Sequence, residues 1–271
     1  MLTFGHFIMT LSHCQQRTSN VFMEKGIVFV IGGKIVGNKK TSCSKNSPLK
    51  RKLAYMKVRA VKDDDKKIKK ELLIRAAISL FNKSSFEKIS MDQIAKKAGV
   101  AKGTLYLYFK TKEELFLEIH RMDYDAWFEA FQNFLRSKKP GLSSAELASW
   151  ITNSLKENQR TVRLMAIASA LLEKNVVFES ALRFKDSVRK SVLESAPELC
   201  RALKLKTSDE AVLFLTYLHA LIIGLWHHAE PAPIVVKVLN SSPDFAVFRI
   251  DFFQTLELGI ISILSGIQKN S

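Results

Sequence analysis

Residues 89–115 constrain the fold of this chain more strongly than any other stretch. They read ISMDQIAKKAGVAKGTLYLYFKTKEEL. Ser90 and Gln93 have the spacing of a helix-capping box, and Gly99 suits a turn with positive φ. Thr111 opens a second capping box. The pattern predicts two short helices joined by a glycine turn and followed by the capped start of a third, which is the plan of a DNA-reading helix-turn-helix.

The second short helix, residues 101–109, has two chemically different sides. Leu105 and Phe109, four residues apart, share an apolar side. We expect this side to pack on Ile94 and Leu72, inside the protein. The remaining sides carry polar tips that are free to reach DNA bases and phosphates.

The polar residues sort by the DNA contact that each suits. Lys102 and Thr104 suit base edges, since lysine reaches the guanine acceptors and threonine offers a hydroxyl and a methyl group. Tyr106 suits a thymine methyl or a phosphate, and Gly103 lets the backbone approach the DNA closely. Residues near the helix ends suit phosphates. The predicted DNA-binding residues are Ser90, Lys97, Ala101, Lys102, Gly103, Thr104, Tyr106, Tyr108, Lys110 and Lys112.

The charge of the chain is concentrated at one end. The formal net charge is +16. Residues 1–55 hold nine Lys or Arg and one acid, residues 56–112 hold fifteen and six, and the rest hold eighteen and nineteen. A generally basic protein would spread its excess charge evenly. The uneven charge therefore indicates a polyanionic partner for the front of the chain only.

Residues 1–60 are expected to lie outside the folded domains. The apolar run 26–37 could form an isolated hairpin, which is marginal in water, and residues 39–52 are basic and of low complexity. Met56 leads directly into the first good helix, so translation could start there and the preceding residues could stem from an over-extended gene prediction. The alternative is a disordered basic arm that adds nonspecific phosphate contacts.

The three cysteines and the most apolar run bear on the compartment. Cys14, Cys43 and Cys200 have no metal-ligand or redox spacing and fit a reducing cytoplasm. The first residues lack the basic start and cleavage site of a signal peptide. Residues 211–229 are uncharged and approach the length of a membrane span, but they include Tyr217 and three histidines. A buried helix is expected there, and no membrane partner.

The rest of the chain predicts an all-α protein. Ile68, Leu72, Ala76 and Leu80 recur every four residues, and Leu73, Ala77 and Phe81 widen this apolar stripe, which predicts a helix from about residue 63. No run of alternating strands occurs. Further helices are predicted at about 143–157, 161–173, 177–195, 208–229 and 244–268, with breaks at Pro197, Pro231, Pro233 and Pro243.

Residues 66–115 resemble the DNA-binding domain of the TetR family of bacterial transcriptional regulators. The likeness rests above all on Gly99–Val100, Lys102–Tyr106 and Tyr108–Lys110, and it covers about a fifth of the chain. One departure is Ala101, where the family often has a Ser or Thr that caps the recognition helix. Loss of such a cap costs about 1 kcal/mol.

The resemblance implies a three-helix DNA-binding domain at 61–112 and a larger helical domain at 113–271 that binds an effector and dimerises. Two segments of the larger domain are apolar on more than one face and need cover on all sides. A homodimer through the helices near 208–229 and 244–268 would cover them in a four-helix bundle. It would also set two recognition helices about 34–36 Å apart, which matches a palindromic operator.

Several large apolar side chains of the second domain are candidate linings for an effector pocket, although each alone is more often ordinary core. No buried charge is evident among them, which favours an apolar or aromatic effector. The candidates are Trp127, Phe131, Trp150, Met165, Phe184, Tyr217 and Trp226.

No pattern in the chain favours metal binding or catalysis. On a helix His219 and His227 would lie about 12 Å apart, and His228 would point in another direction. No glycine elbow surrounds a nucleophilic Ser or Cys. We therefore expect neither a metal, nor a cofactor, nor an enzyme. The leading hypothesis is a homodimeric repressor of a palindromic operator, released by a small effector. The alternatives are an activator or architectural DNA-binder without an effector, and an enzyme acting on a hydrophobic substrate.

Overall fold

The computed structural model describes the backbone of residues 48–270 and the side chains of residues 65–269. The chain divides into two compact units, residues 1–54 and 55–271. Of the first unit only the beginning of one helix is described. The predictions for residues 1–60, Cys14 and Cys43 included, therefore fall mainly on residues 1–47, outside the described part.

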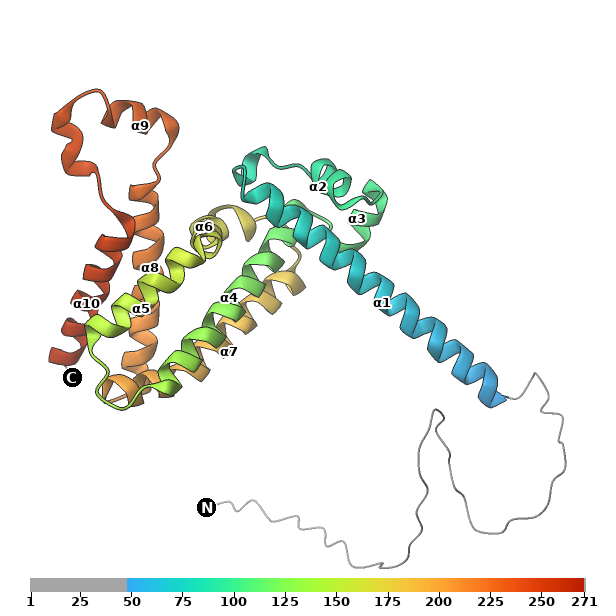
Figure 1. The fold of residues 1–271 in the computed structure, drawn as a ribbon, viewed down its shortest axis with the longest axis horizontal. Helices are drawn as coiled ribbons and strands as arrows, with labels where there is room; N and C mark the ends of the chain where they lie inside the picture. Colours follow the sequence, from blue (N-terminus) through green and yellow to red (C-terminus); the bar gives the residue numbers. More distant parts are fainter. Residues whose placement is uncertain (1–47, 271) are drawn as a thin grey trace, which may run out of the picture. The chain divides into compact units, whose positions relative to one another are not determined.

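Helices make up the described chain, with short 3₁₀ or π segments between some of them (Figure 1). No strand occurs in residues 48–270, which confirms the all-α prediction. The elements in order are α1 (Pro48–Phe81), η1 (Phe86–Lys88), α2 (Met91–Ala98), α3 (Lys102–Tyr108), α4 (Lys112–Ser137), α5 (Ser144–Glu157), α6 (Gln159–Ile167), the π segment η2 (Ala168–Leu172), α7 (Phe178–Leu203), α8 (Ser208–Ala229), α9 (Pro233–Leu239), η3 (Pro243–Phe248) and α10 (Phe252–Asn270).

Two hydrophobic cores hold residues 65–269 together. The first joins α1, α2 and α3 to the first turns of α4, and it also takes in Leu164, Leu172 and Phe184 from the later helices. The second fills the space among α4, α5, α6, α7, α8 and α10. The boundary predicted at residue 112 coincides with the start of α4, but α4 itself contributes to both cores.

The buried face of α1 is one part of the predicted apolar stripe. Leu73 and Ala77 are fully buried, whereas Ile68 is 55% exposed and Leu72 is 41% exposed. Leu72 therefore lies outside the first core and does not provide the predicted packing surface for α3. The reason is geometric, because residues four apart advance about 40° beyond a full turn of the helix. A row from 68 to 80 rotates off any single face, and the other helices cover only its later part.

Three predicted helix ends are wrong. α1 begins at Pro48 instead of near residue 63. α7 continues through Pro197 to Leu203. Proline removes one helical hydrogen bond, but Ala196, Leu199 and Leu203 are buried in the second core and hold the helix together across that gap. The last helix begins at Phe252 instead of 244, because residues 243–248 form a separate 3₁₀ turn capped by Ser242.

Helix α8 is long and apolar enough to cross a membrane by length and composition, the one such helix among the described residues. It contacts α6, α7 and α10. The expected burial on all sides is incomplete, since Leu213 is 41% exposed and Tyr217 is 47% exposed. Leu258 of α10 is 61% exposed as well. The pair α8 and α10 thus keeps apolar side chains uncovered in the single chain.

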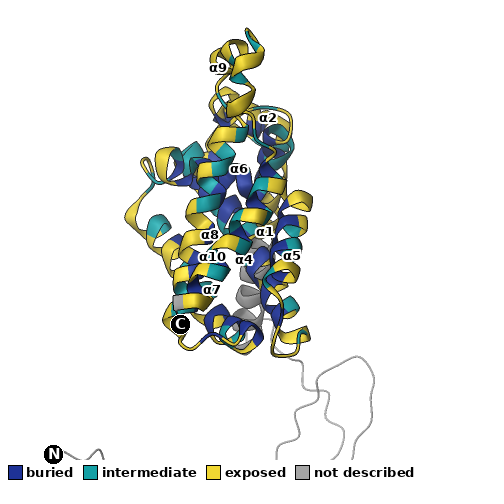
Figure 2. Cartoon of the chain, turned by 90° about the vertical axis from the view of Figure 1, so that its left-hand side faces the viewer, coloured by how far each residue is buried: buried dark blue, intermediate teal, exposed yellow. Residues whose placement is uncertain are grey.

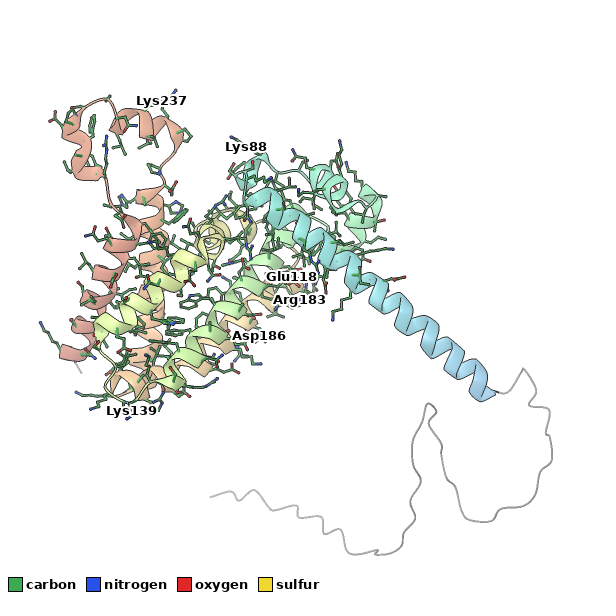
Figure 3. All side chains as sticks on the ribbon, viewed as in Figure 1. Lys88, Glu118, Lys139, Arg183, Asp186 and Lys237 are labelled. Atoms are coloured by element: carbon green, nitrogen blue, oxygen red, sulfur yellow. The ribbon has the colours of Figure 1, made fainter. Side chains whose placement is uncertain are left out.

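The segment between α8 and α10 contributes nothing to either core. Neither α9 nor η3 contains a buried residue, and Figure 2 shows α9 almost entirely in the colour of exposed residues. In Figure 3 Lys237 marks this segment. The described residues of the two cores therefore do not depend on it for their packing.

One titratable side chain lies deep in the protein. His120 is 1% exposed, with its ring centroid 5.1 Å from that of Phe184 and 5.7 Å from that of Tyr124. Its Nδ1 makes no hydrogen bond with the described residues. Burial, with smaller contributions from His219 and Lys185, lowers the pKa of His120 to about 3. The imidazole is therefore neutral at physiological pH.

The buried neutral His120 makes stability depend on pH. As the pH falls below the ordinary pKa of 6.5, His120 becomes protonated in the unfolded chain. In the folded chain it stays neutral until about pH 3. Folding stability should therefore fall by about 2 kcal/mol between pH 6.5 and pH 5. In the His120→Phe variant, which keeps an aromatic ring at this place, urea denaturation should show a smaller loss over that range. Equal losses in both proteins would contradict the assignment.

The carboxylate of Glu118 takes up its proton below this pH range. Burial alone would raise the pKa of Glu118, but hydrogen bonds from Arg121 and Lys70 lower it to about 2. Its contribution is present above its ordinary pKa of 4.5 and is lost as the pH falls towards 2. A comparison restricted to pH 5 and above therefore reports on histidines.

Candidate nucleic-acid interface

The turn between α2 and α3 has the predicted geometry. The Ser90 hydroxyl accepts a hydrogen bond from the Gln93 amide at 3.2 Å, and the Gln93 side chain accepts one from the Ser90 amide at 2.8 Å. These two bonds form a complete capping box. Gly99 ends α2 with φ of +67°, in the left-handed region. The capping box fixes the start of α2, and the left-handed Gly99 sets the direction in which the chain continues to α3.

The two sides of α3 are separated as the sequence indicates. Leu105 is fully buried and Phe109 is 4% exposed, both within the first core. On the other side Tyr106 is 43% exposed and Leu107 is 84% exposed. Leu107 was not among the predicted contacts, since an apolar residue gives no hydrogen-bonding signal. Its exposure leaves it available for an apolar contact such as a thymine methyl.

Ala101 and Gly103 leave the start of α3 open. Ala101 occupies the cap position of α3 and provides no side-chain hydrogen bond, as its residue type requires. A Cβ atom added to Gly103 would meet nothing within 4 Å in the protein. No neighbour inside the protein therefore requires a glycine at 103, which is compatible with a close approach of DNA from outside.

Lys102 and Lys112, two of the predicted contacts, bind other groups of the protein, Lys102 at its surface. The Lys102 ammonium lies 2.7 Å from the Asp92 carboxylate of α2, and that hydrogen bond raises the pKa of Lys102. The Lys112 ammonium donates to the carbonyl oxygens of Phe86 and Ile89 at 2.8 and 2.9 Å. It also lies 4.1 Å from the Phe86 ring centroid. Lys112 therefore holds the loop before α2, and its contact with phosphate remains a prediction.

The N-terminus of α4 is tied to the loop before α7. The Thr111 hydroxyl accepts from the Glu114 amide at 3.1 Å and donates to the Asn175 carbonyl at 2.9 Å. The buried Glu114 carboxylate accepts from the amides of Lys110 and Val177 at 2.9 and 3.4 Å. The sequence indicated the Thr111 cap but not its distant partners. These bonds couple the end of α3 to the helical body.

Four of the seven predicted pocket residues lie close together. The Trp127 ring stacks on that of Phe131 with centroids 5.2 Å apart, and the centroids of Phe131 and Trp150 are 5.6 Å apart. Trp127 and Trp150 line a groove of about 500 Å³ between α4 and α5. Trp127 and Met165 line a small, partly open apolar void of about 20 Å³ among α4, α5, α6 and α8.

The other three predicted pocket residues lie elsewhere. Phe184 packs on His120 in the first core. Tyr217 lies on the uncovered face of α8, and Trp226 meets the edge of Phe252 on α10 with centroids 5.3 Å apart. Among the described residues no group of three or more His, Cys, Asp or Glu side chains could hold a metal ion.

Comparison with known proteins decides the family. The family model described as bacterial regulatory proteins, tetR family, matches residues 73–119, and the one described as tetracyclin repressor-like, C-terminal domain, matches residues 121–271. The second match alone covers more than half of the chain. The chain belongs to the TetR family.

Individual relatives match over short segments. The uncharacterized HTH-type transcriptional regulator YhgD of Bacillus subtilis is 47% identical over 51 residues, which are 19% of this chain and 27% of that protein. The fatty acid metabolism regulator protein of Bacillus subtilis is 32% identical over 66 residues, 24% of this chain and 34% of that protein. The chain thus matches only about a quarter to a third of the length of these relatives.

Solved structures match over a larger share of the chain. The transcriptional regulator FadR from Bacillus subtilis in complex with stearoyl-CoA aligns with 73% of this chain and 98% of that one, with 18% identity and a TM-score of 0.48. The N-terminal TetR match includes all of α2 and α3. The predicted recognition helix therefore lies within the segment of this chain that matches the N-terminal model of the TetR family.

Gly103 offers a test of the interface that separates stability from DNA binding. Gly103→Ala should stabilise the protein by up to about 1 kcal/mol, because alanine favours a helix and meets no clash. The same methyl group should weaken DNA binding where the backbone approaches the duplex. Urea denaturation and fluorescence anisotropy with labelled duplex DNA measure the two effects.

Gly99→Ala is the matched control for this pair of measurements. Gly99 also has open space around its Cβ position but adopts φ of +67°, so alanine there should cost about 1–2 kcal/mol of stability. If Gly103→Ala binds DNA as tightly as the unchanged protein, DNA does not approach the backbone at 103.

Proposed function

We propose that this TetR-family protein is a cytoplasmic transcriptional repressor, which binds a palindromic operator as a homodimer and is released by a small apolar or aromatic effector. The observation that carries the proposal is α3, whose apolar side is buried while Lys102, Thr104 and Tyr106 lie on the open sides. A seven-residue helix cannot be stable alone. The buried Leu105 and Phe109 provide the support that lets its outer side face DNA.

DNA selection tests the operator. We expect sequences selected by the protein from a random duplex pool to contain an inverted repeat, because two α3 helices related by two-fold symmetry read the two half-sites. Lys102→Ala should bind the selected site less tightly by about 1–3 kcal/mol and relax the preference at one base pair in each half. Selected sequences without two-fold symmetry would exclude a palindromic operator.

The uncovered face of α8 and α10 supports a dimer. Leu213, Tyr217 and Leu258 are apolar and exposed in the single chain. A Cβ atom added to Gly259 would lie 2.7 Å from a Leu221 methyl, so the two helices pack closely against one another. A second copy that placed the same helices against this face would complete a four-helix bundle and cover the exposed side chains.

Substitution at Leu258 tests this dimer. Leu258→Asp should shift the protein towards monomers in analytical ultracentrifugation, because it places a charge in the proposed interface. Leu258 is 61% exposed, so the fold of one chain should tolerate the change. Leu193→Asp on α7, at a site that is 54% exposed, is the control and should leave the dimer intact. Equal behaviour of both variants would place the interface elsewhere.

The effector site that we propose lies at Trp127. Trp127 and Thr161 line both the groove of about 500 Å³ and the void of about 20 Å³, so the two adjoin at these residues. The void can hold about one water molecule. The Trp127 indole donates to the Ser154 hydroxyl at 2.9 Å, which holds the ring in place. An effector that displaced this ring would join the groove to the apolar interior.

Helix α4 supports a route from this site to DNA. It carries Trp127 in the second core and begins at Lys112, beside α3. A ligand that prefers a displaced Trp127 would favour a tilted α4 and a different spacing of the two reading helices. Such a ligand acts only through its difference in affinity for the two arrangements.

Tryptophan fluorescence tests the effector site. Compounds that release the protein from its selected operator should change the emission of Trp127 and Trp150. In Trp127→Phe, release should require a higher concentration of the same compound. Trp226→Phe serves as the control, because Trp226 packs on Phe252 outside the groove. A release curve unchanged by Trp127→Phe would refute this location.

A further inference from the structure

A different cavity lies beside the C-terminal end of α3. It has a volume of about 310 Å³ and is lined by side chains of α1, α3, α4 and α7. Glu118 and Arg183, labelled in Figure 3, line it from α4 and α7. Trp127 and Trp150 do not line it, so it is distinct from the effector site proposed above.

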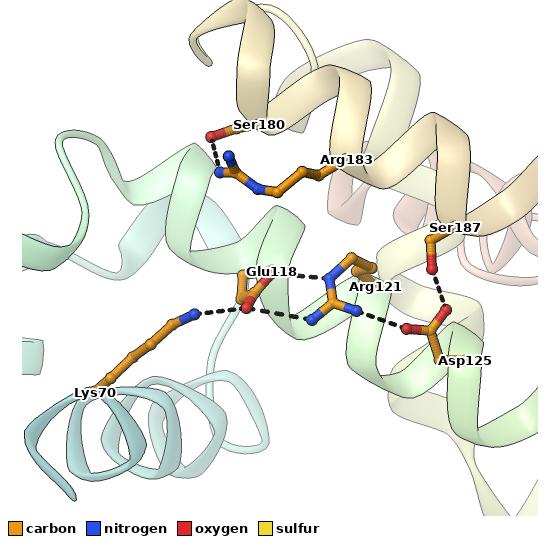
Figure 4. Close-up of polar contacts among 7 residues, drawn as sticks. All are labelled: Lys70, Glu118, Arg121, Asp125, Ser180, Arg183 and Ser187. Atoms are coloured by element: carbon orange, nitrogen blue, oxygen red, sulfur yellow. Dashed lines mark hydrogen bonds and ion pairs between the residues drawn. The ribbon is translucent and has the colours of Figure 1, made fainter. Parts of the chain in front are cut away.

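The two carboxylates that line this cavity, Glu118 and Glu114, are both engaged by neighbouring groups. Glu118 accepts from the Lys70 ammonium at 2.7 Å and from the Arg121 guanidinium at 2.9 Å (Figure 4). Arg121 also contacts Asp125 at 2.6 Å. Glu114, as described above, accepts two backbone amides. Glu118 is therefore paired with two cations, whereas Glu114 keeps its charge, and the lining as a whole holds four cationic side chains against these two carboxylates.

Two cationic side chains in the lining have no carboxylate partner among the described residues. Lys110 forms no ion pair within 4.0 Å there, and the Arg183 guanidinium donates only to the Ser180 hydroxyl at 2.9 Å (Figure 4). Lys110 follows α3, whereas Arg183 belongs to α7. The cavity thus contains surplus positive charge, which comes both from the residue after α3 and from α7.

Aromatic side chains complete the lining. Tyr106 and Tyr108 come from α3, and Phe109 and Phe184 add two further rings. A volume near 300 Å³ is at the lower end for small-molecule sites. Aromatic rings favour a planar ligand, and guanidinium and ammonium groups favour a carboxylate or phosphate.

We propose that this cavity binds a small organic anion, with a planar ring among the aromatic side chains and a carboxylate or phosphate between Lys110 and Arg183. Bound anion weakens DNA binding, because it occupies Lys110 and places negative charge beside Tyr106 and Tyr108. This last consequence rests on the proposed DNA-binding function. The binding of the anion itself does not.

Calorimetric titration of the full-length protein without DNA tests the site. The probes are salicylate for a carboxylate and adenosine 5′-monophosphate for a phosphate, each compared with its uncharged counterpart, salicylamide or adenosine. We expect saturable one-to-one binding of at least one anion, at least about tenfold tighter than its uncharged counterpart. The anion that binds identifies the preferred acidic group.

Two arginine variants give the matched comparison. Arg183→Gln should weaken the anion by about tenfold or more. The fold should tolerate this change, since Arg183 is exposed and makes one side-chain hydrogen bond. Arg189→Gln removes an exposed arginine of the same helix that pairs with Asp186 at 2.6 Å and does not line the cavity. It should leave anion binding unchanged.

The outcomes separate this proposal from the proposed function. If neither anion saturates, or if Arg183→Gln and Arg189→Gln bind it equally, the site is refuted. In anisotropy measurements the anion should release DNA from the unchanged protein and fail to do so from Arg183→Gln. If the protein binds the anion but binds no DNA, the proposed regulator function is refuted and the proposed anion site is supported.

Discussion

The fold depends on one helix that belongs to two hydrophobic cores. The first turns of α4 place Leu115, Phe116 and Ile119 in the first core, together with α1, α2 and α3. Its later turns place Phe131 and Leu135 in the second core. A continuous helix of 26 residues therefore links the two cores physically, as the proposed route from Trp127 to α3 requires.

Polar contacts secure the point where α4 begins. Lys112, Thr111 and Glu114 bind backbone groups of segments distant in the sequence. Each such bond adds about 1 kcal/mol or somewhat more where a charge takes part, which is modest beside the apolar burial on either side. Their main effect is on geometry, because they fix how α3 and the loop before α7 are oriented around the N-terminus of α4.

The sequence predicts those features that depend on neighbours close along the chain. The Ser90 box, the positive φ of Gly99 and the apolar side of α3 all follow from spacings of three or four residues. The role of Lys112 does not, because its acceptors lie 23 and 26 residues away. The exposure of Leu72 and the separation of Phe184 from Trp127 likewise depend on which helices meet in space. Hydrophobicity alone marks these residues as core without saying which core.

The ion pair of Lys102 with Asp92 bears on the proposed recognition of DNA. If Lys102 contacts the duplex as proposed, it has to exchange the Asp92 carboxylate, 2.7 Å away, for a base or phosphate. A duplex that offers Lys102 only a diffuse negative field gains little from that exchange. A guanine edge that offers two acceptors in the right place gains more. Asp92 would then act as a competitor that sets a threshold, favouring discrimination between sequences over simple attraction to nucleic acid.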